Sequence, residues 1–315
     1  VELRHLNLQW TRIRRLPKEM GQLVKLRHLN LGNTNYLLHV PRAALITLRS
    51  LQSLNLIWSG YDMALPGDDG DDERDGICLR DLDCNMDRLE ELGVDIFTSQ
   101  CLRNLVDSKK FQRCTRKLHI TIRQDFGMED LSVATERLEN LEYLHIISCT
   151  SLEGEWRVDG VRQLRRLREL HLHSLEGLRN AVGDFPCLQK LLIANCPQLK
   201  DLNWVGRLPR LEELIVFRCN GIVELLQLSV GDEPGDGDGD GDGQYNSPSF
   251  PMLREMKLSL LPALTSISKG MLLFPSLEKL SVRECWRLKR LPLGLDSGKK
   301  IRKIVAEQEW WDALE

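Results

Sequence analysis

Several features that would assign this chain of 315 residues to a familiar class are missing from it. No apolar run approaches the roughly 20 residues that a membrane-spanning helix needs, and the segment from Val1 has no signal-peptide profile. The nine cysteines include no Cys-x-x-Cys pair, so a disulfide framework is not expected. The absence of an Asn-x-Ser/Thr sequon further favours a reducing, cytosolic location. Because the chain starts at Val1 within a patterned segment, we expect it to be part of a longer protein.

Signatures of catalysis and of nucleic-acid binding are also lacking. The formal net charge is -3, from 43 Lys and Arg against 46 Asp and Glu, which does not indicate a nucleic-acid-binding protein. Residues 294–300 (GLDSGKK) resemble a phosphate-binding loop, but Lys300 replaces the Ser or Thr that would bind magnesium, and the loop is one residue short. No HExxH motif or nucleophile elbow occurs. We therefore expect no enzyme activity, cofactor or metal site in this chain.

What the sequence does contain is a six-residue unit, L-x-x-L-x-L, in twelve strict or looser copies. The first three are LRHLNL from Leu3, LRHLNL from Leu26 and LQSLNL from Leu51. The other copies begin at Leu89, Thr115, Leu141, Leu167, Leu188, Leu211, Leu253, Leu277 and Ile301. Nine of the intervals between starts are 21–26 residues long, and the other two are 38 and 42. A period in the twenties with this unit is the signature of leucine-rich repeats.

The repeat predicts the fold class. Each unit reads as a short strand whose alternate side chains face opposite ways, and no unit can bury its own leucines without a neighbour. The chain is therefore predicted to be an α/β leucine-rich-repeat solenoid, curved, with a parallel concave sheet and about twelve irregular repeats. Short helices and loops should lie on the outer face. We expect one domain over residues 1–315.

A histidine and a cysteine in the string LEYLHIISC raise the question of a catalytic dyad or a zinc site. Cys149 lies three residues after the last apolar residue of its unit. Cys196, Cys219 and Cys285 have the same offset, and Thr11 and Thr34 take it in the first two repeats. This is the position where leucine-rich repeats place a small, inward-facing residue. We therefore predict that these cysteines are buried and structural.

His145 belongs to a second column, which holds the outward residue between the last two apolar positions of each unit. The column contains Asn7, Asn30, Asn55, Gly93, His119, His145, His171, Leu192, Ile215, Lys257, Ser281 and Val305. Since neighbouring strands are about 4.8 Å apart, His119, His145 and His171 should form a row on the concave face. A row of imidazoles permits a metal ion, but parallel strands do not make them converge tetrahedrally. A polar, aromatic contact surface is the preferred interpretation.

Three insertions interrupt the repeats. Two are rich in Gly and Asp, at about residues 66–77 and 229–248, and should be loops on the outer face. In the second, Asp236, Asp238, Asp240 and Gly241 match the start of an EF-hand loop, but Ser247 replaces the bidentate glutamate. A solvated linker is preferred there, and calcium binding stays an alternative. The third insertion, at about residues 99–112, has a helical pattern.

Three longer strings resemble a known family. They are LVKLRHLNLGNTNYLLHVP, LEELGVDIFTSQCLRNLVDSKKFQRCTRKLHI and RLKRLPLGLDSGKKIRKIVAEQEWWDALE. They are similar to the leucine-rich-repeat region of plant intracellular immune receptors (disease resistance proteins), specifically the class with an N-terminal coiled coil. That resemblance covers the whole chain. It implies a nucleotide-binding domain outside the chain that holds ADP or ATP, and a cytoplasmic, in part nuclear or peripheral-membrane, location.

The resemblance also implies two roles and the partners that go with them. The region would hold the nucleotide switch closed at rest by contacting the receptor's own nucleotide-binding domain. It would also detect a pathogen effector or a guarded host protein. An alternative stays open: the substrate-recognition module of a cytosolic F-box-type ubiquitin ligase adaptor would use the same repeat. Neither function requires nucleic acid or a membrane span.

We choose the predicted contact residues by their position and chemistry. Outward side chains do not pack in the core, so their identity can be selected for binding a partner. Large aromatic residues carry much of the binding energy at interfaces. The predicted partner-binding residues are Trp58, His119, Tyr143, His145, His171, His173 and Phe217. The predicted intramolecular contact is a basic patch near the N-terminus, with Arg4 and Arg27 in strand positions: Arg4, Arg12, Arg14, Arg15 and Arg27.

Overall fold

The computed structural model describes residues 2–63, 76–123, 126–148, 154–158, 164–183, 185–226, 250–268, 272, 274–291 and 300–314. The chain divides into two compact units. The first unit is Val1–Leu152 with Gly160–Leu167, and the second is Glu153–Asp159 with Arg168–Glu315. The single domain expected over residues 1–315 thus contains two units, each with its own strands and core. None of the described helices has the length and apolar character needed to cross a membrane.

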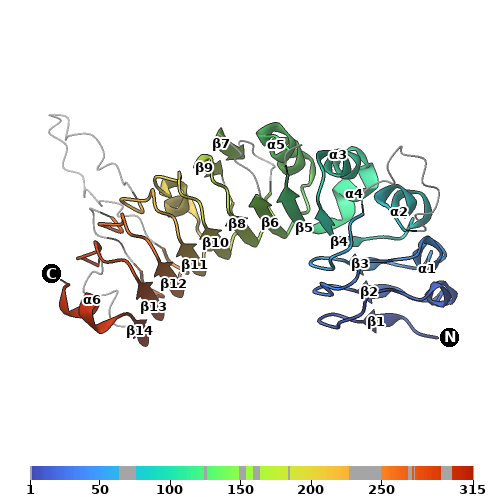
Figure 1. Cartoon of the computed structure of the whole chain (residues 1–315), viewed down its shortest axis with the longest axis horizontal. Helices are drawn as coiled ribbons and strands as arrows, with labels where there is room; N and C mark the ends of the chain where they lie inside the picture. Colours follow the sequence, from blue (N-terminus) through green and yellow to red (C-terminus); the bar gives the residue numbers. More distant parts are fainter. Residues whose placement is uncertain are drawn as a thin grey trace, which may run out of the picture. The chain divides into compact units, whose positions relative to one another are not determined.

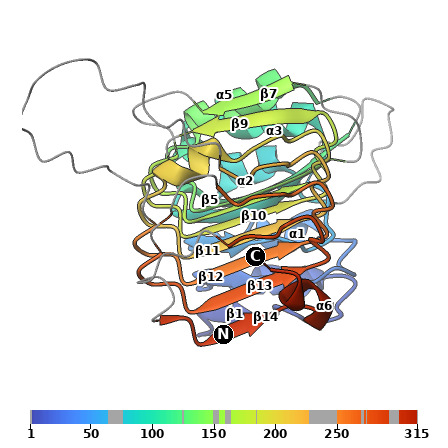
Figure 2. The ribbon, with the colours of Figure 1, turned by 90° about the vertical axis from the view of Figure 1, so that its left-hand side faces the viewer.

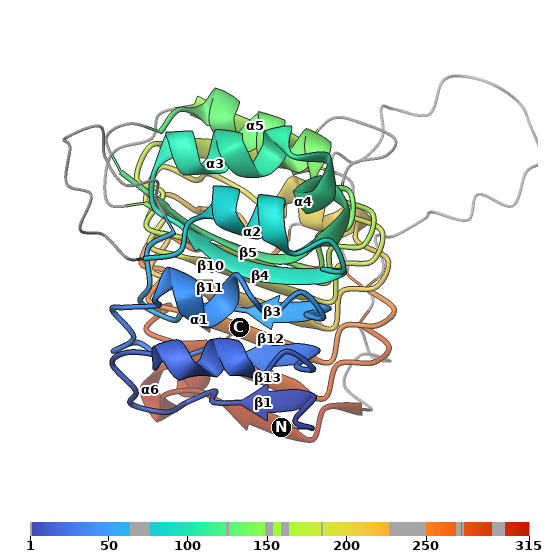
Figure 3. The same ribbon diagram turned by 90° about the vertical axis from the view of Figure 1, so that its right-hand side faces the viewer.

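The first unit is a parallel sheet with helices over one face. Its strands, in both spatial and chain order, are β1 His5–Asn7, β2 His28–Asn30, β3 Ser53–Asn55, β4 Glu91–Ile96, β5 Thr115–Ile122 and β6 Tyr143–Ser148. Its helices are η1 Lys18–Gln22 (a 3-10 helix), α1 Arg42–Leu45, α2 Leu79–Asn85, α3 Ser99–Asp107, α4 Lys109–Cys114 and α5 Met128–Arg137. Figure 3 shows α1 to α5 lying over one face of these strands. The opposite, open face carries the outward column.

The second unit repeats the arrangement with fewer helices. Its repeat strands are β8 Glu169–His173, β10 Lys190–Ala194, β11 Glu213–Phe217, β12 Glu255–Ser259, β13 Lys279–Arg283 and β14 Lys303–Val305. Between repeats, β7 Gly154–Val158 and β9 Leu178–Gly183 pair in parallel as a separate two-stranded sheet. The remaining elements are the 3-10 helix η2 Asn203–Arg207 and α6 Gln308–Asp312. Figures 1 and 2 show β10 to β14 stacked in order, with α6 beside the last of them.

The predicted leucine-rich-repeat fold is confirmed. Every L-x-x-L-x-L unit contains one strand of a parallel sheet, six in each structural unit. The leucines pack between repeats: Leu26, Leu29 and Leu31 are at most 1% exposed. Burying a leucine side chain contributes on the order of 2 kcal/mol, so the shared core holds neighbouring strands in register.

The cysteine column is structural, as predicted, for the members that the structure describes. Cys196, Cys219 and Cys285 are fully buried and unpaired. Each thiol lies near the carbonyl oxygen two residues before it, for instance Cys285 Sγ at 3.3 Å from Arg283 O. Burial raises the pKa of the Cys285 thiol to about 11, which keeps it protonated and unreactive. Cys149 lies outside the described residues.

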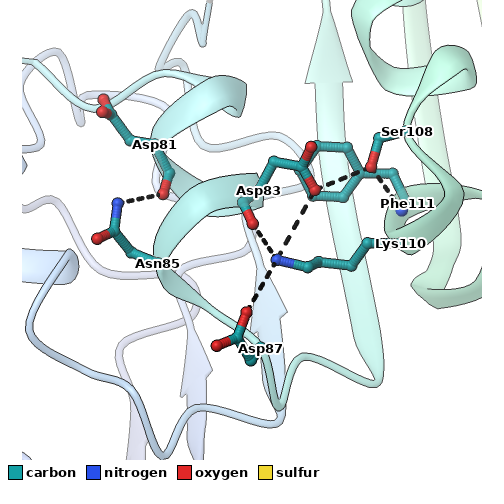
Figure 4. Close-up of polar contacts among 7 residues, drawn as sticks. All are labelled: Asp81, Asp83, Asn85, Asp87, Ser108, Lys110 and Phe111. Atoms are coloured by element: carbon teal, nitrogen blue, oxygen red, sulfur yellow. Dashed lines mark hydrogen bonds and ion pairs between the residues drawn. The ribbon is translucent and has the colours of Figure 1, made fainter.

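Two of the three predicted insertions fall mostly where the chain is not described, at residues 66–75 and 229–248. Residues 99–112 carry α3 and most of α4, which are separated at Ser108. Ser108 Oγ accepts a hydrogen bond from Phe111 N and so caps α4. The same hydroxyl donates to Asp83 of α2 at 2.9 Å, and Lys110 forms ion pairs with Asp83 and Asp87, each at 3.7 Å (Figure 4). These contacts fasten α4 to α2.

The last repeat is closed by α6. Trp310 is 1% exposed, and its indole Nε1 donates to Leu288 O at 2.9 Å. A terminal repeat of a solenoid otherwise leaves its core leucines open to water. The closing segment EWWDALE therefore acts as a cap on the second unit.

Candidate functional site

The open face of the first unit begins with a row of asparagines. Asn7, Asn30 and Asn55 occupy equivalent positions in β1, β2 and β3. Asn30 Oδ1 accepts from Gly32 N at 3.0 Å and from Asn55 Nδ2 at 2.9 Å. The row therefore fixes the turn after each strand and links the strands to one another. A hollow of about 280 Å³ lies over it, with further lining from His5, His28, Glu91, Arg116 and Lys117.

The predicted outward column holds from Asn55 to Gly93 but is wrong at the step from Gly93 to His119. Gly93 of β4 pairs with Lys117 of β5, and Asp95, two residues further on, pairs with His119. The cause is a β-bulge, since Leu92 pairs with Thr115 and leaves Arg116 as an extra residue. The bulge brings a carboxylate that the sequence analysis had not considered into the histidine row.

Asp95 holds the turn after β3. Its side chain is buried, with the residue 3% exposed. One carboxylate oxygen accepts from Trp58 N at 3.1 Å, and the other accepts from Ser59 N at 3.3 Å. Trp58 has a positive φ of 60°, which is uncommon for a residue other than glycine. The carboxylate thus stabilises a strained turn that points the indole onto the open face.

Trp58 covers two of the predicted histidines. The indole stacks on His119 with ring centroids 4.0 Å apart, and His119 stacks on His145 at 4.9 Å. Asp95 Oδ1 also lies 3.1 Å from His119 Nδ1, so that nitrogen carries the proton and donates to the carboxylate. The predicted adjacency is confirmed for His119 and His145. Their predicted exposure is not, because His119 and His145 are only 4% and 7% exposed.

The indole is therefore the most accessible of the three stacked rings. Trp58 is half-buried, as is Tyr143, which lies two residues before His145 on β6. Parallel stacked imidazoles do not converge on one point. Within the described ranges, no group of three or more His, Cys, Asp or Glu side chains is arranged to hold a metal ion. Partner contact by Trp58, His119, Tyr143 and His145 stays a prediction.

The other predicted contact residues lie on the second unit. His171 is half-buried, and burial together with the nearby Lys190 cation lowers its pKa to about 4. Its Nε2 lies 3.8 Å from Glu169 Oε2. His173 is held at both ring nitrogens, by Ser174 Oγ at 2.8 Å and by Asn195 Nδ2 at 3.5 Å. Phe217 is the last residue of β11, and the Arg218 guanidinium lies 5.7 Å from its ring centroid. The structure thus divides the seven predicted contact residues between the two units.

All five arginines of the predicted basic patch are exposed: Arg4, Arg12, Arg14, Arg15 and Arg27. Arg4 and Arg27 precede their strands instead of lying in them, since β1 and β2 begin at His5 and His28. Leu38 N donates to Arg14 O at 3.0 Å, so residues 14 and 38 lie on adjacent segments.

Three large apolar residues on these same segments were missed by the sequence analysis. Trp10, Tyr36 and Leu38 are 74%, 56% and 74% exposed. The signal for Trp10 was present, because it follows Leu8 by two residues as Trp58 follows Leu56, and both have positive φ. The patch is therefore both basic and aromatic. Asp95 was also missed, although a charged residue between Val94 and Ile96 in an apolar strand was its signal.

Comparisons with known proteins agree with this architecture. The family model described as "Leucine-rich repeat region" matches residues 1–310. The chain is 29% identical to the probable disease resistance protein At5g47260 of Arabidopsis thaliana, over 99% of the chain and 30% of that protein. It is 26% identical to disease resistance protein RPS5 of the same plant, over 100% of the chain and 32% of that protein. The chain thus spans about a third of the length of these relatives.

Proposed function

Because this chain belongs to the leucine-rich repeat region family, we propose that it is the recognition and autoinhibitory module of a plant intracellular immune receptor. The relatives that cover the whole chain are named disease resistance proteins, and this supports the immune role over the F-box-type adaptor. The partners in this proposal are a pathogen effector or a guarded host protein, and the receptor's own nucleotide-binding domain.

The observation that carries the recognition role is the Trp58 cluster. An aromatic side chain that is rigid before binding loses little conformational entropy on association. Trp58 has this property because His119 and His145 support one side of its ring. Asp95 holds the backbone of the same turn. The indole is thus a preorganised anchor on the open face.

The autoinhibitory role is supported by the patch of Arg12, Arg14 and Arg15 beside Trp10 and Tyr36. Arginine and aromatic residues are enriched where proteins contact one another. No ion pair joins these three arginines to an acidic residue in the part of the chain that the structure describes. They are therefore available to an acidic surface of the nucleotide-binding domain.

Charge reversal in the full-length receptor tests the autoinhibitory role. Arg12→Glu, Arg14→Glu and Arg15→Glu together should release the resting state, because the reversed charges would repel an acidic surface. We expect defence signalling and cell death in leaf tissue without any pathogen. The matched control reverses three exposed charges of the second unit, Arg283, Arg287 and Lys289, and should stay silent. A triple reversal that is expressed normally and stays silent would contradict the resting contact.

A further inference from the structure

Five consecutive strands of the second unit end in the same strained turn. The residue after each strand has a positive φ of 50–55°: Ser174, Asn195, Arg218, Leu260 and Glu284. Backbone N–H groups join successive turns to the next strand, for example Asn195 N to Phe217 O at 2.9 Å and Leu260 N to Arg283 O at 2.9 Å. The turns are therefore stacked in register along one edge of the sheet.

A groove runs across these turns, here named the turn groove. It has a volume of about 680 Å³ and is lined by the five turn residues and by the residue two positions after each. Apolar lining comes from Leu260, Pro197, Pro262 and Trp286, whose indole is 46% exposed. Five strands spaced about 4.8 Å apart span about 19 Å. At about 3.3 Å per residue, an extended peptide of six or seven residues has this length.

Charge along the turn groove follows a simple order. Glu176 belongs to the first turn, Arg218 to the central one and Glu284 to the last. All three side chains are exposed, and among the described residues no ion pair involves them. Arg218 instead lies over the Phe217 ring, where it is reachable from the groove and from the open face. Two strand spacings separate the central turn from either end, about the length of three extended residues.

We propose that the turn groove binds an extended segment of a partner protein that has a carboxylate at its centre and a basic residue at each end. The carboxylate meets Arg218, the basic residues meet Glu176 and Glu284, and apolar residues between them pack on the two prolines and Trp286. This inference deepens the proposed recognition function and rests on it. It assigns the second unit a binding site beside the open face.

Peptide binding to the whole chain tests the proposal. The probe is a fluorescein-labelled heptapeptide with lysines at both ends, aspartate in the centre, and valine and proline between, because proline favours extended backbone. The control peptide has the same composition with aspartate moved to one end, so that both peptides have the same net charge. We expect at least tenfold tighter binding of the first peptide, measured by fluorescence anisotropy.

Two variants locate the site. Arg218→Glu should abolish the preference for the central aspartate. Glutamate is compatible with this turn, because Glu284 adopts the same positive φ in the last turn of the groove. Trp286→Ala should weaken binding of both peptides several-fold. Arg287→Glu is the matched control, because this exposed residue lies outside the groove lining, and it should keep the preference. Circular dichroism of each variant establishes that the fold is intact.

Equal binding of the two peptides, or no binding of either, would overturn the turn groove as a peptide site. So would a preference that survives Arg218→Glu. These outcomes would leave the proposed immune function standing, since that function is read from defence signalling by the full-length receptor.

Discussion

At the scale of single residues, Asp95 decides how the open face of the first unit is presented. In the first two repeats, the turn N–H groups of Trp10 and Asn33 donate to backbone carbonyls of the next repeat, Gly32 O and Ile57 O. In the third repeat, the Asp95 carboxylate takes over this role for Trp58. A carboxylate replaces a carbonyl because β4 runs on to Ile96, past the position where the earlier strands end.

Replacing Asp95 should therefore cost more stability than replacing an outward carboxylate beside it. Asp95→Ala removes the acceptor of Trp58 N and of the buried His119 Nδ1, whereas Ser59 N keeps Leu56 O at 3.0 Å. We expect a loss of about 2 kcal/mol. The matched control is Glu91→Ala on the same strand, which removes only an exposed contact with Ser53 at 3.0 Å and should change stability by less than about 0.5 kcal/mol. Urea denaturation followed by tryptophan fluorescence measures both. Equal losses for the two variants would contradict the role given to Asp95.

At the scale of elements, the repeat strands were predictable and their neighbours were not. Each L-x-x-L-x-L unit predicts its strand because, in a strand, alternate residues face the same side. The leucines of one unit then lie on one face, where the neighbouring repeats bury them. The bulge at Arg116 was hidden, since the apolar residues of β5 still alternate with polar ones after the register shift. Helix α5 and the pair β7–β9 lie between repeats, where no repeating pattern constrains the chain. Cys196 and Cys285 were placed correctly because a whole column of residues shares their environment.

The contact between α2 and α4 gives a prediction at this scale. Lys110 is half-buried and bonds Asp83 and Asp87, as well as the carbonyl oxygen of Asp83. Lys110→Met keeps the apolar stem and removes the charge, so α2 and α4 should separate more readily, by about 1 kcal/mol. Hydrogen exchange of the amides in both helices measures this opening. The neighbouring exposed Lys109→Met is the control and should exchange like the parent protein. Unchanged exchange in Lys110→Met would show that packing alone fastens the helices.

At the scale of the whole molecule, the chain has three different surfaces for which we propose partners. The first unit carries the Trp58 cluster and the basic, aromatic patch around Arg12, and the second unit carries the turn groove. Position in the repeat predicted that outward histidines would be neighbours. It did not predict that Trp58 would cover them, because a turn conformation and a bulge together place the indole. The surface around Trp58 therefore depends on a turn that recurs in the repeats and on one departure from them, the register shift between β4 and β5.

The central claim, that the preorganised Trp58 indole is a recognition anchor, is tested most directly in the full-length receptor in its own plant. The measurement is the defence response to a pathogen strain that the parent receptor detects, compared between the parent, Trp58→Ala and the control Trp311→Ala, which alters an exposed indole near the C-terminus. Truncation of an interface anchor costs about 2 kcal/mol or more of binding. The account predicts that Trp58→Ala is expressed, stays silent at rest and fails to respond, while Trp311→Ala responds normally. A Trp58→Ala receptor that responds like the parent would contradict it.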